Sequence, residues 1–261
     1  MSSITTDPPH PSQQRGRVVI EATHLRRTAP GLPSQVLLHD ASIALCAGDR
    51  VAVVGPSGAG KSVLLRLLAS LDAPSSGSLT WQGQAVTRRN ILAYRRAIAY
   101  VAQRPAMFDG SVEDNLRIPY TLAIYRDSRY DRAAVETLLK AAGRDARFLD
   151  KSADQLSGGE AQITALIRVL QLRPAVLLLD EPTAALDPDS AATVEAMVDS
   201  WFRASPAAAL AWISHNPSQA QRIGNRTLHM EAGRVQELGQ ERVQERGYER
   251  GYQRGYEDKH E

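Results

Sequence analysis

The sequence predicts an α/β fold with a helical lobe inserted between two halves that carry the strands. Two observations support this prediction. Short apolar runs typical of strands alternate with segments of helical periodicity in both halves, and a mostly helical stretch, about 105–172, separates them. With 261 residues, 43% of them hydrophobic, the chain can bury the core of one large domain and such an insertion.

The first half is expected to supply three strands and a helix. Strands are predicted over residues 18–23, 41–46 and 50–54, and the third is a short apolar run that ends at Gly55. In residues 61–71 leucines recur at helical spacing, which predicts an amphipathic helix directly after that strand.

Three further strands are expected, on either side of the helical stretch. Residues 98–101 precede the helical stretch, whereas 175–179 and 208–213 follow it. The run at 175–179 is apolar at every position, as expected of a strand that is covered on both faces of a parallel sheet.

Both ends of the chain differ in composition from the predicted domain, 17–236. Residues 1–16 are rich in Ser, Thr and Pro and lack the apolar stretch of a secretory signal, so we expect a disordered leader. Residues 237–261 form a charged Gly/Tyr/Arg segment that repeats with a period of four from Gly239. Because frequent glycine disfavours a helix, a solvated low-complexity tail is expected, and an arm that contacts a partner or nucleic acid is the alternative.

The overall composition argues against several classes of protein. The 31 basic and 29 acidic residues nearly balance, which gives no general attraction to nucleic acid. No run approaches the ~18 apolar residues of a membrane-spanning helix. The single Cys46 excludes a disulfide within the chain and is expected to be a small buried side chain in a reducing compartment. We therefore expect a cytosolic protein, held at a membrane only through partners.

A glycine-rich loop lies between the third strand and the helix after it. Its sequence fits the phosphate-binding pattern G-x-x-x-x-G-K-[ST] in full. The glycines let backbone N–H groups turn toward a phosphate, and the start of the helix adds its partial positive charge. Lys61 would reach the β- and γ-phosphates, and the Ser62 hydroxyl would bind Mg²⁺. The predicted ATP-binding residues are Gly55, Pro56, Ser57, Gly58, Ala59, Gly60, Lys61 and Ser62.

Two carboxylates follow the apolar run at 175–179. A strand that ends in Asp180 and Glu181 delivers both acids to the carboxyl edge of the sheet, beside the phosphate loop. Asp180 would hold Mg²⁺, directly or through water, and Glu181 would orient or deprotonate the attacking water. Together with the loop, this pair predicts a P-loop NTPase that hydrolyses its nucleotide.

The turn Leu156-Ser157-Gly158-Gly159-Glu160 indicates which class of P-loop NTPase this is. It lies about one helix-length before Asp180 and resembles the signature of ABC ATPases, a resemblance that extends over residues 17–235. In that family the signature opens a helix whose N-terminus binds the γ-phosphate held by the opposite subunit. The resemblance implies that Ser157, Gly158 and Gly159 contact ATP in trans, across a homodimer.

Three further positions match the family in its usual order. Gln103, after the strand 98–101, resembles the glutamine that senses Mg²⁺ and water. His215, after the strand 208–213, resembles the histidine that contacts the γ-phosphate. The turn that ends in Asp187 resembles the loop whose aspartate crosses the dimer interface. The implied catalytic set is Lys61, Gln103, Glu181 and His215, and the implied Mg²⁺ ligands are Ser62, Gln103 and Asp180.

The resemblance also implies architecture and partners. Members of the family combine a P-loop NTPase core of the RecA type with a small antiparallel β subdomain and the inserted helical lobe. They use ATP and Mg²⁺ to energise a separate multi-span membrane permease, which would dock near the Gln103 loop and the lobe. We therefore expect a peripheral protein at the cytoplasmic face of the cell membrane, with no nucleic-acid partner.

The chain departs from the family at several positions. Near Leu25, Arg26 and Arg27 there is no aromatic side chain to stack on adenine, although an arginine could stack instead, so the adenine contact stays open. Ile163 stands where arginine is frequent, and Val63 where a second hydroxyl is frequent. None of these positions belongs to the hydrolytic set, so an active ATPase is expected.

Two short segments resemble the ATP-binding subunits of bacterial iron exporters and imply iron export as the transport reaction. Both lie in the helical stretch, where a permease would dock. One runs through Phe108, Val112, Asn115, Leu116 and Pro119, and the other spans residues 167–171.

Two other functions compete with transport. An ABC ATPase that acts on ribosomes or nucleic acid generally carries two cassettes or a long coiled coil, and this chain shows one cassette and no sustained heptads. A P-loop kinase would leave Glu181 and the Ser157-Gly158-Gly159 turn without a role. A transporter subunit is therefore the leading prediction, and a multi-span membrane protein encoded by a neighbouring gene would support it.

Overall fold

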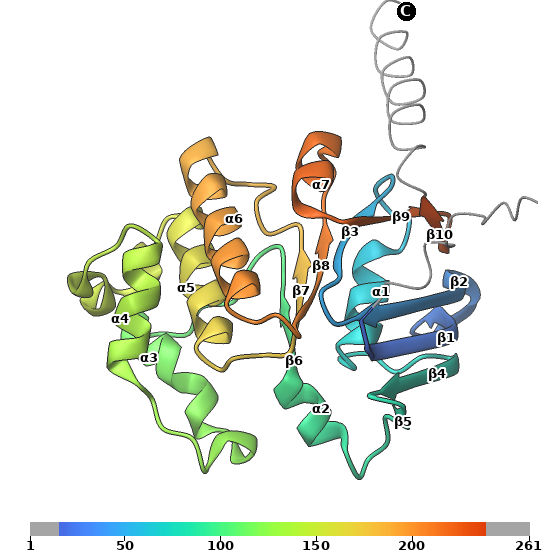
Figure 1. Ribbon diagram of the computed structural model, residues 1–261, viewed down its shortest axis with the longest axis horizontal. Coiled ribbons are helices and arrows are strands. Elements are labelled where there is room, and N and C mark those ends of the chain that lie inside the picture. Colours follow the sequence, from blue (N-terminus) through green and yellow to red (C-terminus); the bar gives the residue numbers. More distant parts are fainter. Residues whose placement is uncertain (1–15, 239–261) are drawn as a thin grey trace, which may run out of the picture.

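The structure, a computed structural model, describes residues 16–238, and these residues form two β-sheets flanked by helices. In Figure 1 the larger sheet runs through the middle of the molecule, with a group of helices on one side and the smaller sheet on the other. The helices are α1 (Lys61–Leu68), α2 (Ile91–Ala97), α3 (Val112–Arg117), α4 (Arg132–Ala141), α5 (Gly158–Leu170), α6 (Pro188–Arg203) and α7 (Pro217–Ile223).

The larger sheet brings several loops to one edge. Its strands are ordered β10-β9-β3-β8-β7-β6, and all neighbours pair in parallel except β10 and β9. Because parallel strands end at the same edge, the segments after β3, β6, β7 and β8 emerge close together. These strands are β3 (Arg50–Val54), β6 (Ile98–Val101), β7 (Val176–Asp180), β8 (Ala209–Ile213), β9 (Arg226–Glu231) and β10 (Arg234–Leu238).

Both faces of the larger sheet are covered. All five residues of β7 are buried, and the side chains of the first four alternate between two hydrophobic cores. Val176 and Leu178 belong to the core shared with α1 and the smaller sheet, whereas Leu177 and Leu179 belong to the core shared with α5 and α6. Burial on both faces explains the continuous apolar run from which this strand is predicted.

The smaller sheet is antiparallel, with the strand order β2-β1-β4-β5. Its two long strands extend well beyond the predicted segments 18–23 and 41–46, because they pair with each other as one hairpin. Register shifts along this pair interrupt the alternation of apolar side chains, so the sequence pattern reveals only part of each strand. The strands are β1 (Val18–Ala29), β2 (Leu32–Cys46), β4 (Ser76–Trp81) and β5 (Gln84–Ala85).

Between β6 and β7 the chain is mostly helical. Figure 1 shows α3, α4 and α5 grouped beside the larger sheet. Two of these helices begin with a capping box, formed by Ser111 with Asp114 in α3 and by Ser157 with Glu160 in α5. Short 3₁₀ helices complete the lobe at Ile118–Thr121, Ala123–Tyr125, Ala146–Asp150 and Ala153–Gln155.

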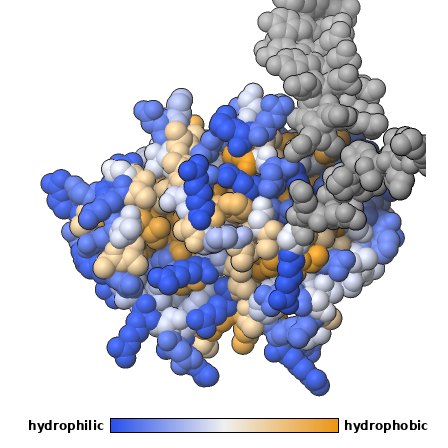
Figure 2. Space-filling model, viewed as in Figure 1, coloured by the Kyte–Doolittle hydropathy of each residue, from blue (hydrophilic) through white to orange (hydrophobic). Residues whose placement is uncertain are grey.

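The surface carries polar side chains over most of the face in Figure 2, and hydrophobic residues show between them near the middle. Within residues 16–238, no helix has both the length and the apolar character needed to span a bilayer. Nearly all of the predicted leader 1–16 and of the predicted tail 237–261 lies outside the described residues. The boundaries of the predicted domain, 17–236, stay predictions.

Candidate active site

A cavity of about 360 Å³ opens at the carboxyl edge of the larger sheet. The loop after β3 and the first turn of α1 line it together with residues that follow β7 and β8. The structure thus brings the glycine-rich loop, the second acidic residue and the histidine into one place. The cavity is lined by Leu37, Ser57, Gly58, Ala59, Gly60, Lys61, Ser62, Val63, Glu181 and His215.

The backbone of the loop requires glycine where it leaves β3. The φ angle of Gly55 is 143°, and a Cβ at this position would come within 2.0 Å of the Met230 carbonyl oxygen. Gly60 forms the N-cap of α1. The first N–H groups of a helix have no acceptor within the helix, so α1 offers free donors and a partial positive charge to the cavity. An anionic group such as a phosphate fits this wall.

Lys61 supplies a full positive charge to the same wall, although the residue is only 5% exposed. Its ammonium group donates hydrogen bonds to the carbonyl oxygens of Gly55 (2.8 Å) and Pro56 (2.9 Å). Burial lowers the pKa of Lys61, while the carboxylates of Glu181 and Asp180 act in the opposite direction. Because its present partners are neutral carbonyls, the ammonium can turn to an anion that enters the cavity.

Asp180 is held by two hydroxyl groups. The Ser62 hydroxyl donates to Asp180 Oδ1 (2.9 Å), and the Tyr100 hydroxyl, from β6, donates to Oδ2 (2.8 Å). Burial, together with the charge of Asp180, raises the pKa of Tyr100, so its phenol stays protonated as a donor. Adjacent hydroxyl and carboxylate oxygens are ligands that Mg²⁺ prefers. Within residues 16–238, no group of three or more His, Cys, Asp or Glu side chains is arranged to hold a metal ion by itself.

Glu181 follows β7 in a backbone conformation that residues other than glycine rarely adopt, with a φ of 48°. Strained residues of this kind are concentrated at functional sites. One oxygen of its carboxylate pairs with the His215 ring, and the other accepts a hydrogen bond from the Gln103 side-chain amide (3.1 Å). Three predicted residues, from the segments after β6, β7 and β8, therefore meet here.

The predicted signature turn does not line this cavity. Ser157 forms the N-cap of α5, and Gly159 packs against the start of α6, where a Cβ would lie 2.5 Å from Ser190 Oγ. Asp187 forms the N-cap of α6 by accepting a hydrogen bond from the Ser190 N–H (2.9 Å). The signature turn and Asp187 thus lie together, outside the cavity of their own chain.

The sequence prediction did not identify Leu37 or Tyr100 as site residues. Leu37, on β2, lines the cavity, whereas the sequence left the adenine contact open because no aromatic side chain stands near Leu25 on β1. A leucine in a long strand gives no sequence signal of a ligand contact. Tyr100 did have a signal, since it stands near the end of β6, three residues before Gln103, and therefore near the edge where the site lies.

Comparisons with known proteins match this chain in sequence and in fold. The sequence model of the family described as "ABC transporter" matches residues 38–184. The chain is 37% identical to the probable iron export ATP-binding protein FetA of Escherichia coli (strain K12), over 77% of this chain and 88% of FetA. It is also 37% identical to the phosphate import ATP-binding protein PstB 2 of Natronomonas pharaonis, over 87% of this chain and 80% of that protein.

The fold matches solved structures as well. A dimeric ATP-binding cassette in a post-hydrolysis state, bound to ADP and Pi, superposes with a TM-score of 0.74 at 24% identity, over 84% of this chain and 97% of that chain. The match confirms the predicted fold class, an α/β core with a small antiparallel subdomain and an inserted helical lobe.

Proposed function

This chain belongs to the ABC transporter family of ATP-binding subunits, and from that premise we propose that its domain, residues 17–236, hydrolyses ATP to drive transport through a separate membrane permease. The observation that carries the proposal is that the phosphate loop, Glu181 and His215 line the same cavity. A site that only binds a nucleotide needs the loop alone, whereas hydrolysis also needs groups that handle the attacking water.

The cavity residues have distinct proposed roles. Lys61 and the N–H groups of the loop would hold the β- and γ-phosphates. Glu181 would orient or deprotonate the attacking water, and His215, paired with that carboxylate, would contact the γ-phosphate. Gln103, hydrogen-bonded to Glu181, would communicate the state of the site to the helical lobe that follows it in the chain.

The pair of Ser62 and Asp180 would hold Mg²⁺, with Gln103 as a further proposed ligand. The ion, when bound, would neutralise charge on the phosphates. Tyr100 would fix the orientation of the Asp180 carboxylate, because its hydroxyl donates to Oδ2 and leaves Oδ1 beside Ser62.

A homodimer with shared sites would account for the position of the signature turn. Ser157 and Gly158 are exposed in the single chain, so a second copy can reach them. Two copies related by a two-fold axis would place each nucleotide between the phosphate loop of one chain and the Ser157-Gly158-Gly159 turn of the other, with Asp187 at the same interface.

Lys61→Ala should weaken ATP binding roughly 10- to 100-fold, because it removes the full positive charge from the phosphate wall and a charge-assisted contact contributes about 1.5–3 kcal/mol. Isothermal titration calorimetry measures the dissociation constant. Lys140→Ala is the matched control, since Lys140 is exposed on α4, and it should bind ATP like the wild type. An unchanged dissociation constant for Lys61→Ala would count against the loop assignment.

Iron export is the transport reaction that we propose, at the cytoplasmic face of the cell membrane. Its support is that the two segments resembling subunits of iron exporters contact each other in the lobe. Asn115 is fully buried and donates to the Phe108 carbonyl oxygen (2.8 Å), and Gln171 donates to the Leu116 carbonyl oxygen (2.6 Å). These residues therefore pack as one unit in the lobe where the permease would dock, and Phe108 follows shortly after Gln103 in the chain.

The test is reconstitution in liposomes with the multi-span protein encoded by a neighbouring gene. Fe²⁺ should raise the ATPase rate of this complex, and phosphate, tested at the same concentration, should not. Stimulation by phosphate alone would contradict iron export and leave transport standing. Failure of the two proteins to copurify would contradict the transport function itself.

A further inference from the structure

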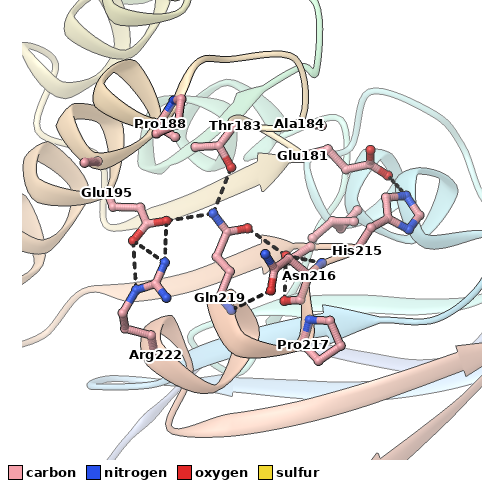
Figure 3. A pocket seen from close by; sticks show the side chains of 14 residues that line it. Glu181, Thr183, Ala184, Pro188, Glu195, His215, Asn216, Pro217, Gln219 and Arg222 are labelled. Carbon is pink, nitrogen blue, oxygen red and sulfur yellow. Dashed lines mark hydrogen bonds and ion pairs between the residues drawn. The ribbon is translucent and has the colours of Figure 1, made fainter. Parts of the chain in front are cut away.

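A second, larger cavity of about 1050 Å³ shares Glu181 and His215 with the first. Figure 3 shows a chain of hydrogen bonds along it, centred on the side-chain amide of Gln219 from α7. Gln219 is only 9% exposed, so the orientation of its amide depends on the partners that the protein offers.

Each polar group of this amide has a partner. The nitrogen Nε2 donates to Thr183 Oγ1 (2.8 Å) and to Glu195 Oε1 (2.7 Å), and the oxygen Oε1 accepts from the Ser214 hydroxyl (2.6 Å). An ionised carboxylate only accepts hydrogen bonds, so Glu195 determines which end of the amide is the nitrogen. The side chain therefore has one orientation that satisfies all of its neighbours.

Two of the partners adjoin the proposed catalytic pair. Thr183 lies two residues after Glu181, and Ser214 directly precedes His215. The Ser214 hydroxyl also accepts from the N–H of Asn216, which closes the backbone around the histidine (3.0 Å). One glutamine thus connects the turn that carries the carboxylate to the turn that carries the imidazole.

The turn at Glu181 needs support from its surroundings, because its left-handed backbone persists only where other contacts enforce it. A hydrogen bond from the Ala184 N–H to the Glu181 carbonyl oxygen closes this turn (3.2 Å). The bond from Gln219 to Thr183 fixes the same turn from the opposite element, α7.

We propose that Gln219 is a positioning residue for hydrolysis, which aligns Glu181 with His215 by holding Thr183 and Ser214. Gln219 does not line the cavity of the phosphate loop, so it acts on the chemical step and leaves ATP binding unchanged. The inference rests on the proposed roles of Glu181 and His215.

Gln219→Glu tests the proposal with a side chain of the same shape. The substitution removes both donors and places a carboxylate against that of Glu195. Repulsion between the two carboxylates then moves the side chain away from Thr183, and the tether is lost. The value of kcat should fall roughly 10- to 100-fold, because a misplacement of ~1 Å at reacting groups costs rate on this scale. The dissociation constant for ATP should stay within about twofold of the wild type.

Two single variants accompany it. Thr183→Val removes the same tether without adding charge, and it should lower kcat in the same direction by a smaller factor. Arg222→Gln is the matched control, because Arg222 contacts Glu195 in the same cavity from a side chain that is 60% exposed, with no bond to Thr183 or Ser214. Its kcat should equal that of the wild type.

The double variant Gln219→Glu with Glu195→Gln exchanges the two groups. The new glutamine donates to the new carboxylate, Ser214 still donates to it, and the Thr183 hydroxyl can rotate to donate, so much of the lost kcat should return. If the wild type is active and Gln219→Glu keeps the same kcat, the inference is wrong and the proposed function still stands. Three other results would also contradict the inference: an equal loss of kcat in Arg222→Gln, a loss of ATP affinity in Gln219→Glu, or a double variant that recovers no kcat. An inactive wild type would instead contradict the proposed function.

Discussion

Glu181→Gln should lose ATP turnover by roughly 10²- to 10⁴-fold, the usual contribution of a positioned general base, and still bind ATP. The substitution keeps the shape of the side chain and removes its negative charge and its basicity. A glutamine can keep both contacts of Glu181, since its amide oxygen can accept from the Gln103 side chain while its nitrogen donates to the His215 ring. The phosphate wall, built from the loop and Lys61, is untouched. Phosphate release measures the rate, and calorimetry measures the affinity.

A second readout follows from the proposed dimer. Because ATP would join two subunits and hydrolysis would release them, Glu181→Gln should accumulate as an ATP-bound dimer in gel filtration, whereas the wild type returns to monomer. Glu136→Gln is the matched control, because Glu136 is a partly exposed residue on α4 that pairs with Arg132, and it should hydrolyse ATP normally. Wild-type turnover in Glu181→Gln would overturn the assignment of this residue.

The parts of the site that the sequence predicts are those in which chain order dictates position. Gly55, Glu181 and His215 each come shortly after a parallel strand, so their meeting at one edge follows from topology alone. The strand β7 could be predicted from its apolar run, because burial on both faces leaves no polar residue before Asp180.

The parts that could not be predicted depend on pairing in three dimensions. Leu37 lines the cavity because β2 passes beside the loop, and nothing in the local sequence records that approach. Gln219 and Thr183 are 36 positions apart and meet only because α7 packs beside the turn after β7. A glutamine in the short segment after Pro217 is an ordinary helix residue by its sequence, so its role emerges only from its partners.

Ser157→Arg should block hydrolysis while each chain still binds ATP. In the proposed dimer Ser157 lies at the interface, against the nucleotide of the partner subunit, and arginine adds bulk and charge there. The substitution also removes the N-cap of α5, which costs about 1 kcal/mol of stability. Ser111→Arg separates the two effects, because Ser111 forms an equivalent capping box on α3 and lies outside both cavities. It should share the small loss of stability and keep the ATPase rate.

Mixing variants tests whether the site is shared between chains. Ser157→Arg and Lys61→Ala should each be inactive alone. In a mixed dimer one composite site loses both residues and the other keeps both, so an equal mixture should recover at most about a quarter of the wild-type rate. If each chain hydrolysed ATP by itself, the mixture would stay inactive. The rate of the wild type should also fall with the square of protein concentration at high dilution, and a rate strictly proportional to concentration, with no dimer present, would refute the shared site.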